Sequence, residues 1–202
     1  MKMISVLSLV VSLFLVLGST SCGSKVGDPD EVAVIETNYG NIVIEFLPGD
    51  APKHVAHFKE LARDGSYEGT KFHRIVKISN RLTAIQGGDP NSINGDPSTW
   101  GQGQPGQEKV PAEFSKTLKH ERGTVAAARR GNDPDSATSQ FFICTAANPS
   151  WDGQYSIFGR VVDGMNVVDS ISRAPTVNNS DRPLDPVVIK SVRIVKREEA
   201  KE

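Results

Sequence analysis

The sequence predicts a mainly β fold, a closed antiparallel β-barrel capped by two α-helices. Three observations support this prediction. Short runs of β-branched and aromatic residues recur along the chain, eighteen glycines and twelve prolines are spread between them, and only two segments have helical periodicity. A length of 202 residues suits one domain of ordinary size, with a mixed α+β sandwich as the competing architecture.

The folded region begins with a hairpin and a helix. Apolar residues alternate from 32 to 46 around the turn-forming residues 38–41, which predicts two antiparallel strands. A helix is predicted between Pro52, which suits a first turn, and Gly65, which suits a helix end; Asp50 is its candidate N-cap.

Later segments are mostly strand-like. Further strands are predicted at 71–76, 141–145, 157–162 and 187–195. A second helix is predicted over 163–172, because Met165, Val168 and Ile171 fall on one face. Residues 89–106 are rich in Gly, Pro, Asn and Gln and are predicted to form one long exposed loop. The domain is predicted to span 31–197, followed by a charged tail at 198–202, with fraying expected over 196–202.

The N-terminal segment has the features of a targeting signal. A positive start at Lys2 and an apolar run over 4–17, too short to cross a bilayer, predict an export signal over residues 1–21. Cys22 follows directly and resembles the lipidated cysteine of a bacterial lipobox, with 22–30 as acylated residue and tether. The expected location is therefore outside the cytoplasm, on a membrane facing the periplasm or the cell exterior.

Two serines leave an alternative open at this site. Ser19 stands where a lipobox usually has leucine, and Ser19 and Ser21 suit an ordinary signal peptidase that cuts at the same bond. Cleavage without acylation would release a protein that carries no anchor.

Composition excludes several classes of function. The formal net charge is −1, which offers no basic footprint for nucleic acid. The pattern GxGxxG at 101–106 follows no strand and contains Pro105, so it fails as a dinucleotide motif, and the acidic stretch at 89–100 lacks the glutamate of a calcium loop. Cys144 lies in an apolar strand and is interpreted as a packed thiol.

No metal site is expected either. His54 and His57 lie three residues apart on the predicted first helix, but no carboxylate or cysteine accompanies them in the local sequence. We therefore interpret both as packed or solvated histidines.

The most informative residues form three short segments, 72–74, 86–89 and 139–143. Together they supply one guanidinium, two amides and an aromatic wall, without a metal, a nucleophile or paired acids. Such a set suits a reaction that needs no covalent chemistry.

These segments resemble the cyclophilins, and the resemblance extends from 32 to 195. It is carried by the motifs at 38–40, 69–74, 86–89, 111–114, 123–126, 139–145 and 158–159. The resemblance implies an eight-stranded barrel with a helix at each end, and a monomeric peptidyl-prolyl cis–trans isomerase without a cofactor. Its partners would be proline-containing segments of exported proteins, with the membrane contacted only through the lipid.

The resemblance also implies roles for individual residues. Arg74 would donate hydrogen bonds to the prolyl nitrogen and carbonyl, Phe142 would hold the proline ring, and backbone groups near Arg129 and Arg130 would fix the peptide. The implied substrate contacts are His73, Gln86, Ala128, Arg129, Gln140, Phe142, Trp151 and Tyr155.

One departure from the family concerns the pocket wall. Arg74 and Gln86 are twelve residues apart instead of eight, and Thr83 and Ala84 stand where the family has Phe and Met. Two other residues, Ile78 and Leu82, are candidates to rebuild the wall. The alternative is a catalytically weak peptide-binding or chaperone module on the same barrel; a purely structural envelope lipoprotein would leave the arginine, amide and aromatic set unexplained.

A second departure concerns drug binding. Ser150 replaces the tryptophan that contacts cyclosporin in the family, Trp151 follows one residue later, and Tyr155 stands where some members have histidine. We therefore expect weak cyclosporin binding.

Overall fold

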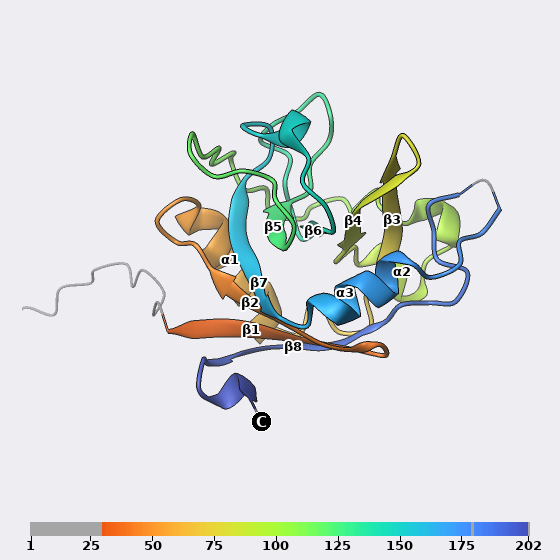
Figure 1. The fold of residues 1–202 in the computed structure, drawn as a ribbon, viewed down its shortest axis with the longest axis horizontal. Coiled ribbons are helices and arrows are strands. Elements are labelled where there is room, and N and C mark those ends of the chain that lie inside the picture. Colours follow the sequence, from red (N-terminus) through yellow and green to blue (C-terminus); the bar gives the residue numbers. More distant parts are fainter. Residues whose placement is uncertain (1–29, 179, 202) are drawn as a thin grey trace, which may run out of the picture.

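The computed structural model describes residues 30–178 and 180–201, and its main feature is one eight-stranded antiparallel sheet (Figure 1). The strands are β1 (Glu31–Thr37), β2 (Gly40–Phe46), β3 (Phe72–Ile78), β4 (Arg81–Gly87), β5 (Thr124–Ala127), β6 (Phe141–Cys144), β7 (Ile157–Asp163) and β8 (Ile189–Lys196). The helices are α1 (Pro52–Arg63), α2 (Asn91–Asn94) and α3 (Met165–Ser172), with 3₁₀ turns η1 (Pro97–Thr99), η2 (Pro149–Trp151) and η3 (Glu199–Lys201).

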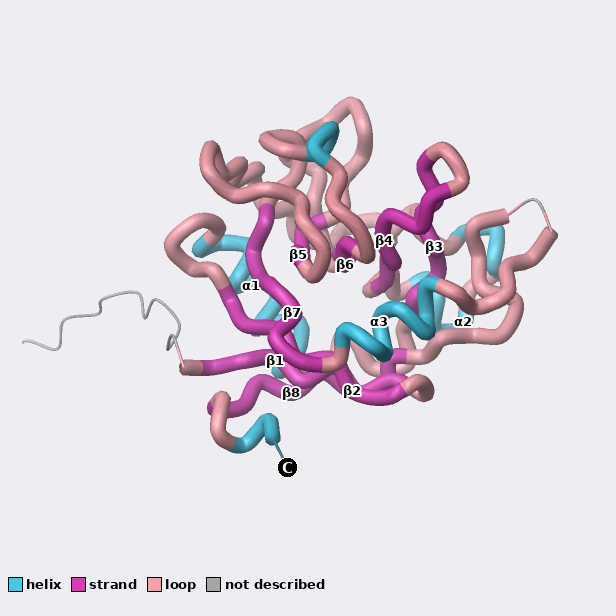
Figure 2. The backbone as a smooth tube through the Cα atoms, in the orientation of Figure 1, coloured by secondary structure: helices cyan, strands magenta, loops and turns pink. Residues whose placement is uncertain are grey.

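The sheet curls strongly but does not close, so the prediction of a closed barrel is wrong (Figure 2). Its order is β3-β4-β6-β5-β7-β2-β1-β8, which leaves β3 and β8 as the two edges. In residues 30–178 and 180–201, these edges meet through a single bridge, Lys71 to Val188, and a few neighbouring backbone hydrogen bonds. A ladder cannot continue before β8, because Pro183 and Pro186 have no N–H to donate.

The core lies inside this curl and is organised around Phe58 of α1. Its ring centroid lies 4.9 Å from that of Tyr67, 5.3 Å from Phe158 and 5.5 Å from Phe141. Aromatic pairs at such distances add to the free energy gained by burying their apolar surface. The predicted second helix is confirmed as α3, whose Val168 and Ile171 are fully buried.

The first helix is also confirmed, but its N-terminus is capped by a residue from another part of the chain. Asp50 does not cap it and instead accepts a hydrogen bond from the Ser115 hydroxyl. The Glu113 carboxylate accepts the backbone N–H groups of Lys53 (3.1 Å) and His54 (3.0 Å). An acceptor sixty residues away in sequence satisfies these helix N–H groups, a solution that local patterns do not reveal.

Two other predicted segments are more ordered than expected. The stretch 89–106 is not one exposed loop: Asp89 is fully buried, and α2 and η1 follow it. At the other end, residues 199–201 form η3, and Ala200 packs against Val32 and its neighbours, so this part of the charged tail is not frayed.

The long spacing between Arg74 and Gln86 is explained by a hairpin. β3 and β4 pair antiparallel and project as a two-stranded arm (Figure 1). Their turn residues, Ser79 and Asn80, have φ angles of 49° and 62°, which is the backbone of a type I′ turn. The four additional residues therefore lengthen the arm, and Arg74 and Gln86 remain register partners.

Candidate active site

A cavity of about 390 Å³ opens where the β3–β4 arm meets β6 and the loop 101–109. It brings together eight of the nine residues predicted to act in catalysis and substrate binding: Arg74, Gln86, Ala128, Arg129, Gln140, Phe142, Trp151 and Tyr155. Residues from distant parts of the chain thus converge on one opening. We call it the first cavity.

The floor of the first cavity is aromatic. The Phe142 ring is 5% exposed and lies 5.1 Å from Trp151 and 5.2 Å from Tyr155, centroid to centroid. His120, which the sequence analysis missed, stacks on Phe142 at 6.0 Å and is held by Asp152. The result is a small apolar pocket with edge-to-face rings around it.

The missing pocket wall comes from a residue that the sequence analysis did not consider. Val76 lines the first cavity and packs with Ala84 and Phe142 in one buried cluster. Of the two candidates, Ile78 is 41% exposed near the tip of the arm, and neither it nor Leu82 lines the cavity. Because Val76 is paired with Ala84 across β3 and β4, a β-branched residue and a small one together replace the expected wall.

Arg74 projects from β3 with a side chain that is half exposed. Its Nε donates to the Asp181 carboxylate at 3.1 Å, and the Asp181 carbonyl accepts the Ile75 N–H at 2.7 Å. Among the described residues, the two terminal nitrogens of the guanidinium have no hydrogen-bond partner. One edge of the guanidinium is thereby fixed, and four N–H donors stay available to a ligand.

Replacing Asp181 with asparagine should lower kcat/KM for a proline-containing peptide about three- to tenfold, mainly through kcat. The substitution removes the charge that orients Arg74, and a loosely held group loses part of its catalytic advantage. Steady-state kinetics on Arg74→Ala, Asp181→Asn and the double variant will test this. If Asp181 acts through Arg74, its loss should change nothing in the Arg74→Ala background. Asp133→Asn, which removes the partner of Lys109 at similar exposure, is the matched control.

Two side-chain amides extend the site from the arginine towards the loop. Gln86 Nε2 donates to Gln140 Oε1 at 3.0 Å, and Gln140 Nε2 donates to the Gly101 carbonyl at 3.2 Å. This chain orients the Gln86 amide and leaves its oxygen free to accept a hydrogen bond from a peptide N–H.

The Arg129 side chain is committed to the protein itself. Its Nε donates to the Gln154 carbonyl, its Nη1 to the carbonyls of Arg130 and Gly131, and its guanidinium lies 4.9 Å from the Tyr155 ring centroid. Arg129 therefore shapes the cavity wall by holding Tyr155 and the neighbouring loop.

His73 is the one predicted contact that lies outside the first cavity. Its side chain is buried, and neither ring nitrogen has a hydrogen-bond partner among the described residues. A second cavity, of about 350 Å³, is lined by His73, Pro97, Trp100, Ser180, Asp181 and Arg182, and shares Arg74, Gln86, Gly101 and Gln102 with the first. Burial lowers the pKa of His73 to about 4, against the weaker opposing influences of Asp89 and of the Lys71 backbone, which lies near the ring without meeting hydrogen-bond geometry.

The fold should lose stability in mild acid because of His73. Between pH 6.5 and about 4 the unfolded chain binds a proton at this residue and the folded chain does not, so the free energy of unfolding falls as pH falls. The loss should reach about 3 kcal/mol at pH 4. Denaturant unfolding at several pH values should show a shallower slope in His73→Leu. A slope equal to wild type would assign the loss to His54 and His120, whose pKa values burial also lowers.

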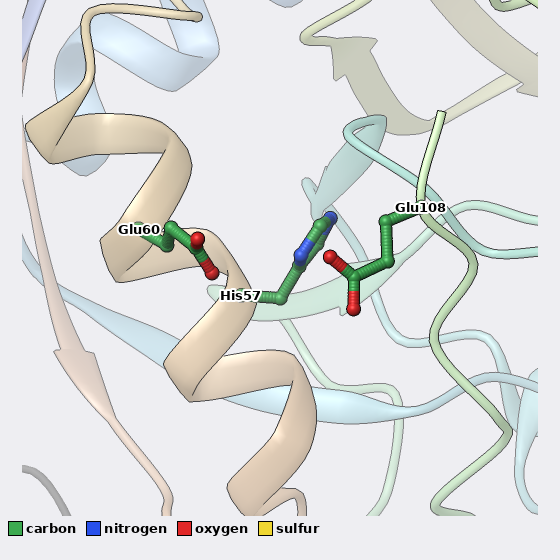
Figure 3. A group of neighbouring side chains, drawn as sticks. All are labelled: His57, Glu60 and Glu108. Atoms are coloured by element: carbon green, nitrogen blue, oxygen red, sulfur yellow. The ribbon is translucent and has the colours of Figure 1, made fainter. Parts of the chain in front are cut away.

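The structure changes the view of the histidines and of Cys144. Glu113 lies 2.7 Å from His54, and His57 shares a surface cluster with Glu60 and Glu108, their ligand-type atoms all within 4.8 Å (Figure 3). The premise that no carboxylate accompanies these histidines is therefore wrong. Two residues of this cluster are exposed, and the expectation that these histidines do not bind a metal ion remains a prediction. Cys144 is confirmed as a packed thiol, since its side chain is fully buried in a hydrophobic cluster, and this burial raises its pKa to about 12.

The loop with the GxGxxG pattern, residues 101–106, forms one rim of the first cavity. Within the described part of the chain, no strand leads directly into residues 101–106 and no helix begins where they end, so the segment lacks the structural context of a dinucleotide motif. In the described part of the chain, no helix combines the length and the apolar character that crossing a bilayer requires.

Comparisons with known proteins agree with this geometry. The family model of the cyclophilin type peptidyl-prolyl cis-trans isomerases matches residues 32–194. A probable peptidyl-prolyl cis-trans isomerase of Brucella abortus is 36% identical over 176 residues, which cover 87% of this chain and 88% of the relative. Peptidyl-prolyl cis-trans isomerase 9 of Schizosaccharomyces pombe is 40% identical over 167 residues, covering 82% of this chain and 25% of that longer protein.

A solved structure is similar as well. A cyclophilin type peptidyl-prolyl cis-trans isomerase from Cryptosporidium parvum, crystallised in the presence of the dipeptide Ala-Pro, superposes with a TM-score of 0.70 at 30% identity. The match covers 82% of this chain and 99% of that one.

Proposed function

The chain belongs to the cyclophilin family of peptidyl-prolyl cis–trans isomerases, and we propose that it accelerates X-Pro rotation in exported polypeptides, with Arg74 as its catalytic residue. The observation that carries this proposal is the juxtaposition in one cavity of an anchored guanidinium with free donors and a closed aromatic floor. A cyclic, apolar side chain suits the aromatic floor, and because Arg74 lines the same cavity, we expect the amide that precedes the ring to lie within reach of the guanidinium.

The chemistry of the reaction explains why these groups are enough. Resonance in the X-Pro amide sets a rotation barrier of roughly 18–20 kcal/mol. In the twisted transition state resonance is lost, and the prolyl nitrogen becomes pyramidal and gains a lone pair. Hydrogen bonds from the free Nη donors of Arg74 strengthen at that point, so they stabilise the transition state more than the ground state.

The aromatic floor and the amides supply binding and orientation. Phe142, Trp151 and Tyr155 hold the proline ring while the rest of the peptide rotates. Gln86, fixed by Gln140, meets the peptide backbone. Val76 rebuilds the wall, which favours an active enzyme over the alternative of a weak peptide-binding module.

An isomerase assay on a short X-Pro peptide tests the activity, with the mature chain beginning at Cys22. The expected result is a rate of cis–trans interconversion well above that of the uncatalysed reaction, which takes tens to hundreds of seconds. Peptide binding without turnover would instead support the binding-module alternative.

The proposed setting is the cell envelope. The apolar segment at 4–17 and the following Cys22 support export and acylation, and these residues lie outside the part that the structure describes. Mass spectrometry of the mature N-terminus should find an acylated Cys22. An unmodified cysteine there would reject the membrane anchor while leaving export intact.

A further inference from the structure

The second cavity adjoins the first. Arg74, Gln86, Gly101 and Gln102 line both cavities. An extended chain advances roughly 3.3–3.6 Å per residue. A peptide with its proline on the aromatic floor therefore reaches the second cavity within one or two residues.

Positive charge dominates the lining of this second cavity. Arg74 and Arg182 are cationic, Asp181 is the one carboxylate in the lining, and burial keeps His73 neutral near pH 7. The Asp181 carboxylate already accepts a hydrogen bond from Arg74 Nε, so its charge is paired with Arg74. Asp96 lies near Arg182 but outside the lining, and its carboxylate accepts hydrogen bonds from Ser98.

Arg182 is held in place, and the charge near it is that of Asp96, whose pKa it helps to lower without forming a hydrogen bond or an ion pair with it. Its guanidinium lies 5.5 Å from the Trp100 ring centroid, and its backbone is fixed at both ends, by the Ser180 hydroxyl and by the Val177 N–H. Trp100 is itself anchored, because its indole N–H donates to the Gly95 carbonyl. Among the described residues, the Arg182 side chain makes no hydrogen bond and no ion pair, so all five N–H donors are available.

We propose that the second cavity is a subsite for an acidic side chain, aspartate or glutamate, next to or one residue from the proline, with Arg182 binding its carboxylate. A planar guanidinium that lies over a tryptophan ring and makes no hydrogen bond or ion pair among the described residues can bind a carboxylate in a bidentate geometry. Lysine or arginine at that position of the peptide would meet two guanidinium groups. This inference deepens the proposed function, since it requires a proline peptide in the first cavity.

Peptides that differ only at the residues flanking proline, with Glu, Gln or Lys at each position in turn, test the subsite. At one position the wild-type chain should have kcat/KM about five- to tenfold higher for Glu than for Lys. The preference should shrink in 0.5 M salt, because ions screen a partly exposed pair. Arg182→Gln should bring the three peptides within about twofold of one another, mainly by lowering kcat/KM for the Glu peptide.

Controls separate the subsite from the fold and from catalysis. Arg173→Gln, an exposed arginine at the end of α3 outside both cavities, should keep the wild-type preference. Equal rates for the three peptides in wild type, or a preference that survives in Arg182→Gln, would overturn the subsite, as would an equal loss with all three peptides. Tryptophan fluorescence titration measures the same preference as affinity, so a failure of turnover is distinguishable from a failure of the subsite.

Discussion

Replacing Arg74 with alanine should lower kcat/KM about ten- to a hundredfold and change the free energy of unfolding by less than about 1 kcal/mol. A hydrogen bond from a charged donor is worth about 1.5–3 kcal/mol, which converts to that range of rates. The side chain is half exposed, and its one ion pair, with Asp181, is a surface pair of small weight in stability. Peptide kinetics and denaturant unfolding on the same preparation separate the two effects.

Two further variants make this prediction specific. Arg74→Lys keeps the charge but loses the planar fork and the bond from Nε to Asp181, so we expect it to recover only part of the rate. Arg160→Ala removes an exposed arginine that pairs with Glu45 on the sheet and should leave kinetics unchanged. Unchanged turnover in Arg74→Ala would reject Arg74 as the catalytic residue.

Much of the fold could be predicted because its signals are local. Alternating apolar residues and turn residues predict β1, β2 and their hairpin, and periodicity predicts α1 and α3. The open curl could not be predicted, since it depends on how β3 and β8 meet across more than a hundred residues. The cap of α1 by Glu113 is hidden for the same reason.

The candidate site divides in the same way. Family motifs place Arg74, Gln86, Gln140 and Phe142, and the structure brings all four to the first cavity. The partners that set their geometry lie in segments without such motifs: Asp181 comes from a connection before β8. Val76 could not be predicted by counting residues back from Gln86, because that count stays on β4. The wall residue comes from β3, opposite Ala84, and the additional residues lengthen the turn end of the β3–β4 arm.

Removing the carboxylate of Asp89 should have the largest effect on stability among the residues around the site. Asp89 is fully buried, and its two oxygens accept the N–H groups of Asn91 (3.0 Å), Gly101 (2.5 Å) and Gly103 (3.3 Å). Gly101 and Gly103 line the first cavity and have φ angles of 86° and 71°, a backbone that other residues adopt at a cost. One buried carboxylate thus fixes the rim of the cavity.

Asp89→Ala should therefore lower the free energy of unfolding by about 3–5 kcal/mol, because it leaves three N–H donors without their acceptor. Asp89→Asn should cost about 2–3 kcal/mol, since its amide turns a donor towards one of those N–H groups.

In whichever variant still folds, KM should rise more than kcat falls, because the rim shapes the cavity and does not touch the reacting bond. The matched control is Asp96→Asn: Asp96 accepts the same kind of hydrogen bond from the backbone two residues on, but it is exposed, so its loss should cost much less stability than the loss of the Asp89 carboxylate. Equal costs at the two positions would show that the turn, and not the buried carboxylate, holds the rim.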